Sequence, residues 1–132
     1  VAAEYKRQNA TVLAQIQFDM TAFVKKGTRE EVGVITDFVD SNVVKFVKQL
    51  IDAYLDIPYV ETKCGYACSD HASWTKNGYP SSFAIESSFE NSNHAIHSTS
   101  DRMDIEGFSF DHMLEFSKLA VAFAIELADY KP

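Results

Sequence analysis

The stretch CGYACSDHASW, residues 64–74, gathers several reactive side chains in one short run. Cys64 and Cys68 lie four residues apart, which is wider than the spacing of zinc ribbons and of thioredoxin-like motifs. The chain has 2 cysteines, so no second pair exists to complete a structural zinc site. The spacing leaves two buried free thiols or a disulfide. It favours the disulfide, which would close a very small ring worth about 2 kcal/mol.

Asp19 is the first candidate metal ligand. It ends an apolar segment with the alternation of a β-strand, and open α/β sheets bind their ligands beyond the ends of their strands. The alternative is that its carboxylate only caps the strand or stabilises a turn.

The four histidines differ in their surroundings. His97, in the polar segment AIHSTSD, is a candidate metal ligand whose imidazole neighbouring hydroxyls could orient; the alternative is a surface or capping role. His71, which lies beside Trp74 in a predicted helix, is expected to be packed structurally, His94 to be solvated, and His112 to have only a local role at a helix start. The chain contains no glycine-rich phosphate loop and no nucleophile elbow.

Strands and helices must position these side chains, and the pattern predicts that they alternate along the chain. Apolar alternation or apolar runs predict four strands, at 11–20, 32–38, 57–62 and around 82–86. Helical signals lie at 40–56, 69–78 and 109–130, and the first nine residues look like the last turns of another helix. This order favours an α/β fold with a largely parallel sheet.

Two of the predicted helices carry capping signals. Asp40 or Ser41 can cap the helix at 40–56, and Ser69 can cap the helix at 69–78. The first of these helices has a predicted apolar face made of Val44, Val47, Leu50, Ile51, Tyr54 and Leu55.

Composition narrows the class of protein and its partners. The 132 residues fit one globular domain, and 46% of them are hydrophobic. The formal net charge of −7 argues against a nucleic-acid partner, and no apolar run of about 18 residues predicts a membrane span. The tripeptide NAT at Asn9 is a glycosylation sequon, which agrees with a secreted protein but also arises by chance.

Several segments together resemble a known family over essentially the whole chain. They are FDMTAF, ITDFVDSN, TKCGYACSDHASWTKNGYPSSFAIESSF, HAIHSTSDRMD and FDHMLEFSKLAVAFAIELA. In matching order, they resemble the C-terminal half of the di-zinc aminopeptidases of the bacterial and fungal leucyl type, and the secreted fungal branch is the closest. Residues 1–132 would then be the C-terminal portion of a single catalytic domain, incomplete at its N-terminus.

The resemblance implies a mixed, largely parallel sheet sandwiched by helices, and a site with two zinc ions. By position, Asp19 matches a terminal carboxylate ligand of one zinc, and His97 matches the imidazole ligand of the other. Cys64 and Cys68 match the family's disulfide, and Tyr66 matches a tyrosine beside the bound substrate. The implied activity is removal of N-terminal residues from peptides with a free N-terminus.

The resemblance also implies a pocket for the N-terminal side chain of the substrate. Its matching positions are all apolar, which would suit leucine, although each could also be plain core. They are Met20, Ile35, Phe83, Ile85, Phe89 and Ile96.

The chain lacks four parts of the family's site: a second His, the bridging Asp, the general-base Glu and a neighbouring ligand Glu. All four lie upstream of the first residue in the family pattern. None of the acids here fits those motifs by position, namely Glu30, Glu31, Asp70, Glu86 and Asp101. We therefore expect the chain alone to be inactive and to bind zinc only weakly, since even an open catalytic site normally uses three protein ligands.

Two other functions remain open at the level of sequence. The chain could be a non-catalytic folded fragment that acts in binding, assembly or antigenicity. It could also be a non-peptidase relative of the glutaminyl-cyclase kind, which the aromatic and cysteine pattern of 64–89 disfavours. Expected partners are peptide substrates, the N-terminal half of the same enzyme, or a second copy, and the expected location is extracellular.

Overall fold

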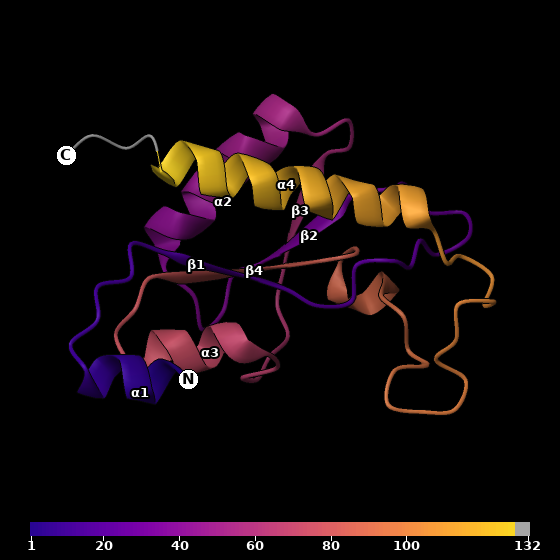
Figure 1. Ribbon diagram of the computed structural model, residues 1–132. Coiled ribbons are helices and arrows are strands. Elements are labelled where there is room, and N and C mark those ends of the chain that lie inside the picture. The colour runs from indigo at the N-terminus through magenta and orange to yellow at the C-terminus, as the bar shows by residue number, and fades with distance from the viewer. Residues whose placement is uncertain (129–132) are drawn as a thin grey trace.

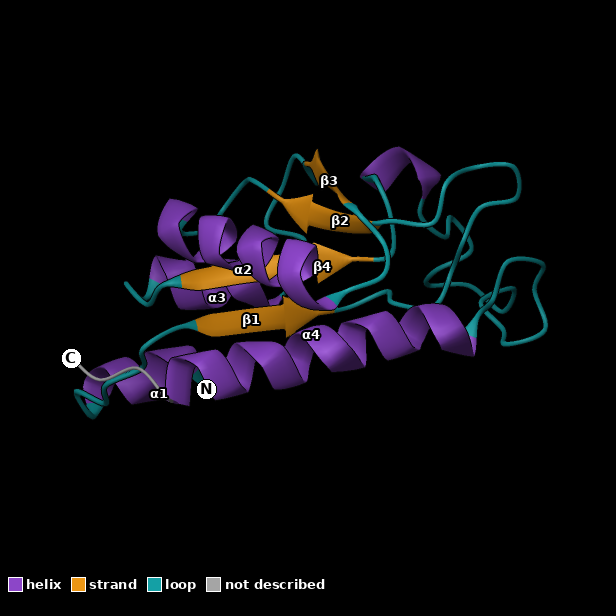
Figure 2. Ribbon diagram, turned by 90° about the horizontal axis from the view of Figure 1, so that it is seen from above, coloured by secondary structure: helices purple, strands orange, loops and turns teal. Residues whose placement is uncertain are grey.

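A four-stranded sheet with helices on both faces forms the frame of the molecule (Figures 1 and 2). The structure is a computed structural model that describes residues 1–128. The predicted α/β class and mixed sheet are confirmed. In chain order the elements are α1 (Ala2–Arg7), β1 (Gln15–Phe18), β2 (Val32–Ile35), α2 (Ser41–Tyr54), β3 (Tyr59–Thr62), α3 (Asp70–Lys76), β4 (Ser81–Ile85), the 3-10 turn η1 (Phe89–Asn91) and α4 (Phe110–Ala128).

The sheet consists of two parallel pairs joined at an antiparallel seam. Its strand order is β1-β4-β2-β3, with β1 parallel to β4 and β2 parallel to β3. The seam lies between β2 and β4, where Gly33 faces Ile85 and Val34 faces Ala84. Figure 2 shows β1 and β4 pointing one way and β2 the other. As a result, β1 and β4 end at the same edge of the sheet.

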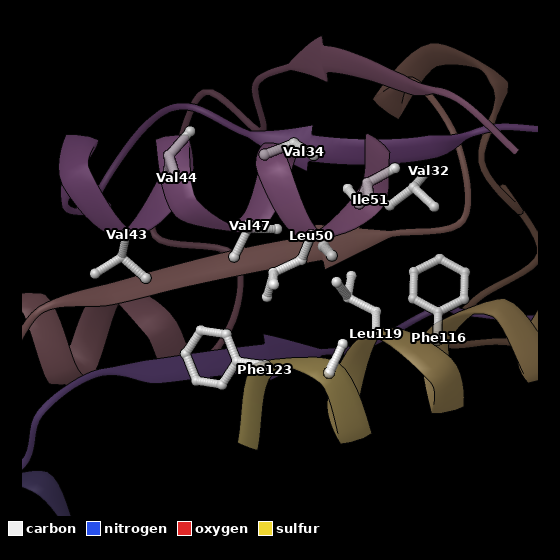
Figure 3. Close-up of a cluster of buried hydrophobic side chains, with 12 residues drawn as sticks. Val32, Val34, Val43, Val44, Val47, Leu50, Ile51, Phe116, Leu119 and Phe123 are labelled. Carbon is white, nitrogen blue, oxygen red and sulfur yellow. The ribbon is translucent and has the colours of Figure 1, made fainter. Parts of the chain in front are cut away.

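The helices divide the core into two layers. Helices α2 and α4 cover one face of the sheet, and α1 and α3 lie on the other (Figure 1). Because successive strand residues point to opposite faces, Val34 and Ala84 join the larger core with α2 and α4 (Figure 3). On the other face Ile35, Phe83 and Ile85 form a smaller buried cluster, on which the site is built.

Three of the predicted strands are too long, and the one expected at 57–62 begins only at Tyr59. The strand expected at 11–20 begins only at Gln15, because its ladder partner β4 begins with Ser81 opposite that residue. The strand expected at 32–38 ends at Ile35.

Helix α2 follows its apolar periodicity, with one exception. Its cap is Asp40, whose Oδ1 accepts from the amides of Asn42 at 2.9 Å and Val43 at 3.0 Å. The prediction that Tyr54 lies on the apolar face is wrong. Its ring is half exposed, and its hydroxyl bonds to Glu126 of α4.

The predicted last helix is confirmed over 110–128, and its final residues, 129 and 130, lie outside the described residues. Across residues 1–128, none of the helices combines the length and the apolar character needed to cross a bilayer.

Gly33 allows β2 to approach the end of β4 closely. A Cβ atom built at this position would lie 1.8 Å from the carbonyl oxygen of Ser87, which is far inside van der Waals contact. Only glycine fits here without moving the backbone. The segment that follows β4 is therefore held directly against the sheet.

Candidate functional site

A cavity of about 300 Å³ lies where β1 and β4 end. Asp19 follows β1, Glu86 follows β4, and His97 comes from the long segment between η1 and α4. Parallel strands place their carboxyl ends, and hence such side chains, at one edge of a sheet. The cavity wall is made of Asp19, Met20, Thr21, Ala22, Phe23, Cys64, Tyr66, Cys68, Phe83, Ile85, Glu86, Phe89, Asn93, Ile96, His97, Asp101, Ile105 and Phe108.

Almost every residue that the sequence proposed for the site lies on this wall. The structure brings together both proposed metal ligands, both cysteines, Tyr66 and five of the six proposed pocket residues. The exception is Ile35, which does not line the cavity. It is fully buried in β2 and packs behind Phe83 and Ile85. The prediction that Ile35 lines the pocket is therefore corrected to a position in the core behind the cavity wall.

Asp19 and His97 both present exposed side chains to the cavity. The Oγ of Ser69 donates to Asp19 Oδ2 at 3.0 Å. Ser69 occupies the N-cap position of α3, as predicted, but its side chain makes no capping hydrogen bond. Its hydroxyl orients the Asp19 carboxylate instead.

Two cavity residues have left-handed backbone conformations that residues other than glycine rarely adopt. The φ angle is +57° at Met20 and +63° at His97. Such strain, which costs on the order of 1–3 kcal/mol, clusters at functional sites where the surrounding structure enforces it. Here it turns the chain sharply next to Asp19 and at His97 itself.

The predicted disulfide between Cys64 and Cys68 is confirmed. The carboxylate of Asp37 fixes this loop: it accepts from the amide of Cys64 at 3.2 Å and from that of Gly65 at 2.8 Å. Tyr66 sits between the cysteines with 58% of its surface exposed. The bridge therefore shapes a short loop that holds an aromatic ring at the mouth of the cavity.

Glu86 is a cavity residue whose structural role sequence reasoning missed. Its side chain is only 3% exposed, and its carboxylate accepts from three backbone amides, those of Ala22, Phe23 and Asn93, at 2.8–3.1 Å. The available signal was a charged residue at the end of the apolar run SSFAI. An acid buried at such a position requires donors around it.

His112 connects distant segments, so the expectation of a purely local role is wrong. It is fully buried, its Nε2 donates to the backbone oxygen of Glu86 at 2.8 Å, and its Nδ1 lies 2.9 Å from Glu30 Oε1. Helix α4 is thereby joined to the end of β4 and to the segment before β2.

His71 is packed structurally, as expected, and its ring lies against the sheet. Its ring stacks on Phe83 with a centroid distance of 4.8 Å, whereas Trp74 packs on two tyrosines. The ring is fully buried and neither nitrogen has a hydrogen-bond partner. Burial lowers the pKa of His71. The Asp37 backbone, which lies near the ring without meeting hydrogen-bond geometry, and the charges of Asp37 and Asp70 oppose this shift.

The donor atoms at the cavity fit zinc in kind but not in number. A carboxylate oxygen from Asp19 and an imidazole nitrogen from His97 are groups that zinc takes. Within residues 1–128, no three His, Cys, Asp or Glu side chains gather closely enough to hold a metal ion. A metal at this cavity would need further ligands from outside those residues.

Comparison with protein families gives one match that covers most of the chain. The model of peptidase family M28 matches residues 1–122. Among curated proteins, the chain is 54% identical to leucine aminopeptidase 1 of Penicillium rubens, covering 97% of this chain and 34% of that protein. It is 53% identical to leucine aminopeptidase 1 of Chaetomium globosum, with 97% and 32% covered. The chain thus spans about a third of the length of these relatives.

Solved structures show the same arrangement of elements. The crystal structure of the Legionella pneumophila LapA aminopeptidase matches with a TM-score of 0.92 and 42% identity, covering 98% of this chain and 34% of that one. The crystal structure of LapB from Legionella pneumophila matches with a TM-score of 0.91 and 29% identity, with 98% and 35% covered.

Proposed function

The chain belongs to peptidase family M28, and from this membership we propose that it forms one part of a zinc aminopeptidase that removes N-terminal residues, preferably leucine, from peptides. Peptidases of this family are generally metal-dependent. The leucine preference follows the names of the fungal relatives and the apolar cavity wall.

One observation supports this proposal above all others. Asp19 and His97, which lie far apart in the sequence, reach a single cavity whose remaining wall is largely apolar. Two metal-binding side chains beside an apolar recess are what an exopeptidase needs in order to hold a reactive centre and recognise a side chain.

In the proposed enzyme, the Asp19 carboxylate would hold one zinc ion and the His97 imidazole would hold the other. Zinc held there would supply polarisation of a scissile carbonyl and a lower pKa for a bound water. The other ligands and the general base come from outside this chain.

The remaining cavity residues act on the substrate in this proposal. Phe83 and Ile85 project from β4, which makes the apolar part of the wall rigid, and Phe89, Ile96 and Met20 extend it. A leucine side chain gains binding energy there because its apolar surface leaves water. Tyr66, held by the disulfide loop, covers the substrate from the mouth of the cavity.

We also propose that the protein is secreted and glycosylated at Asn9. The Cys64–Cys68 disulfide supports an oxidising compartment, and Asn9 is exposed directly after α1. Its expected partners are peptides with a free N-terminus and the remainder of the enzyme, with self-association as the alternative.

The test compares two histidines three positions apart in the full-length protein. We expect His97→Ala to lower kcat/KM for a leucine anilide more than about a thousandfold, because a metal-bound transition state is stabilised by several kcal/mol. His94→Ala is the matched control, since the His94 ring is exposed and bonds only to the backbone oxygen of Glu90 among described contacts. An active His97→Ala variant would contradict the ligand assignment.

The same proposal makes a statement about the 132-residue chain by itself. Because its described residues offer no group of three ligands, we expect no turnover of the anilide and no submicromolar zinc site in a calorimetric titration. Robust activity of this chain alone would contradict the incomplete site. A non-catalytic role for the isolated chain in binding or assembly is the alternative.

A further inference from the structure

Glu86 joins the two segments that carry the proposed metal ligands. Its Oε2 accepts from the amides of Ala22 at 3.1 Å and Phe23 at 2.8 Å, in the segment that begins with Asp19. Its Oε1 accepts from the amide of Asn93 at 2.8 Å, in the segment that leads to His97. One carboxylate therefore holds both segments, one with each oxygen.

The backbone of Glu86 strengthens the first of these connections. Its amide donates to the carbonyl oxygen of Met20 at 2.8 Å, so the segment after β1 is bound to Glu86 at three points. Met20 is one of the two left-handed residues of the cavity. These hydrogen bonds supply the fixed surroundings that such a conformation needs.

Asn93 extends the second connection toward His97. Its Oδ1 accepts from the amide of Ala95 at 2.8 Å, and its Nδ2 donates to Asp101 at 2.9 Å. The side chain is only 8% exposed. The turn that contains His97 is therefore held on both sides, by Ala95 and Asp101, through a residue that Glu86 itself anchors.

The anchor is in turn fixed to the rigid part of the fold. Glu86 directly follows β4, a strand paired on both sides, and its backbone oxygen accepts from the buried His112 of α4 at 2.8 Å. Because Glu86 is fixed to the sheet, its hydrogen bonds also fix the segment after β1 and the segment that leads to His97 relative to the sheet.

We propose that Glu86 is a positioning residue whose carboxylate sets the relative placement of Asp19 and His97. What those two side chains do rests on the function proposed above. Glu86 itself touches neither metal nor substrate in this proposal. The residue is only 3% exposed, and its carboxylate already accepts from three backbone donors.

The three backbone amides that surround the Glu86 side chain require a carboxylate at this position. The donors approach both oxygens, and a carboxylate accepts at both. The amide of Gln accepts only at its oxygen, so its NH₂ group would face a backbone N–H and one segment would be released. Asp keeps both acceptors but is one methylene shorter, so it cannot reach both segments at once. Hydrogen bonds to a charged acceptor are also the stronger kind.

The experiment uses Glu86→Gln in the full-length protein, with Glu90→Gln as the matched control because Glu90 is exposed. Hydrogen exchange of the peptides that cover 20–23 and 93–97 is measured first. We expect at least tenfold faster exchange in one or both peptides of Glu86→Gln and no change in the control. Unchanged exchange in Glu86→Gln would overturn the proposal.

Metal affinity and kinetics then separate positioning from a merely structural role. We expect Glu86→Gln to weaken zinc binding about 10–100-fold, as removal of groups that orient metal ligands typically does. We also expect kcat to fall more than tenfold with KM changed less than threefold, because Phe83 and Ile85 of the apolar wall stay in the sheet. Faster exchange with unchanged metal affinity and unchanged kcat would overturn the proposal.

A second variant covers the case in which Glu86→Gln does not fold. Glu86→Asp keeps the charge, and we expect it to release one segment, so that exchange accelerates at 20–23 or at 93–97 but not at both. Unchanged exchange at both would overturn the proposal. The exchange results do not depend on the proposed enzyme, which fails separately if the full-length wild-type protein binds no zinc or if His97→Ala stays active.

Discussion

Two histidines in this molecule are equally buried and yet have opposite environments. His112 on α4 and His71 on α3 both have no exposed surface. His112 bonds through both nitrogens, to Glu30 and to the backbone of Glu86. His71 bonds through neither nitrogen and stacks its ring on Phe83.

The difference shows that the two sides of the cavity are stabilised in different ways. A buried polar group costs free energy unless it finds partners. On the α4 side His112 and Glu86 form a polar network with partners at both ends. On the α3 side the His71 ring packs on Phe83, and its two nitrogens remain without hydrogen-bond partners. The disulfide and the Asp37 carboxylate order the adjacent loop.

The largest effect should come from breaking the polar network. We expect His112→Leu to reduce the free energy of unfolding by about 3 kcal/mol, because a buried acceptor left without its donor costs about 1–3 kcal/mol and the contact to Glu30 is lost as well. Urea unfolding at pH 8 measures it. Under the same conditions His71→Leu should change stability by less than about 1 kcal/mol, since no hydrogen bond is lost. Equal losses in both variants would contradict the comparison.

Removing the disulfide should have the next largest effect, confined to the α3 side. Cys64→Ser with Cys68→Ser opens a ring closed over four residues, which the chain-entropy model values at about 2 kcal/mol. Thermal unfolding measures the loss. The Asp37 hydrogen bonds to the loop remain available, so the α4 side should keep its hydrogen-exchange protection. Loss of protection around His112 would show that the two sides are not independent.

Acid should affect the α3 side through His71. Burial lowers its pKa below the ordinary value of about 6.5, so the unfolded state binds more protons as the pH falls below that value. Stability is therefore complete above about pH 6.5 and declines as the pH falls toward the lower folded-state pKa of His71. We expect His71→Leu to flatten this decline in unfolding experiments between pH 8 and pH 5.

The control for the acid experiment is His94→Leu, because that ring is exposed. It should leave the pH dependence as it is in the wild type. An equally flat curve for His94→Leu would mean that His71 is not the source of the decline.

The smallest effect on stability should come from removing the hydrogen bond that the Ser69 hydroxyl donates to the Asp19 carboxylate. Ser69→Ala removes a partly exposed hydrogen bond and should cost no more than about 1 kcal/mol. In the full-length protein it should weaken zinc binding about tenfold, since groups that orient a ligand contribute this much. Calorimetric titration of zinc checks it. An unchanged affinity would limit the α3 side to a structural role.

The sequence predicted the elements well where periodicity extends over many residues. The helix at 40–56 follows from its apolar spacing and from Asp40, both of which are local signals. The strand ends were less predictable, because β1 begins only at Gln15, opposite the first residue of β4, and β4 lies more than 60 residues further along the chain. The prediction for Tyr54 was wrong, and its hydroxyl bonds to Glu126, a partner 72 residues away that the local apolar pattern does not reveal.

Only those residues of the candidate site that belong to recognisable sequence motifs could be predicted. Resemblance identified Asp19 and His97, and both line the cavity. Ile35 was misplaced because apolar character does not tell a wall residue from the one packed behind it. Glu86 and His112 were missed because their roles consist of hydrogen bonds to residues far away in the chain, which no local pattern records.

The sheet order also has a consequence for how the chain acquires its structure during synthesis. Strand β4 lies between β1 and β2, so neither finds this neighbour until Ser81–Ile85 has been made. At about 5–20 residues per second, that wait lasts several seconds after β1 leaves the ribosome. Until then β1 has an unpaired edge of the kind that promotes aggregation. Stalled chains that end before Ser81 should therefore aggregate more readily than chains that end after Ile85, which sedimentation of truncated chains would measure.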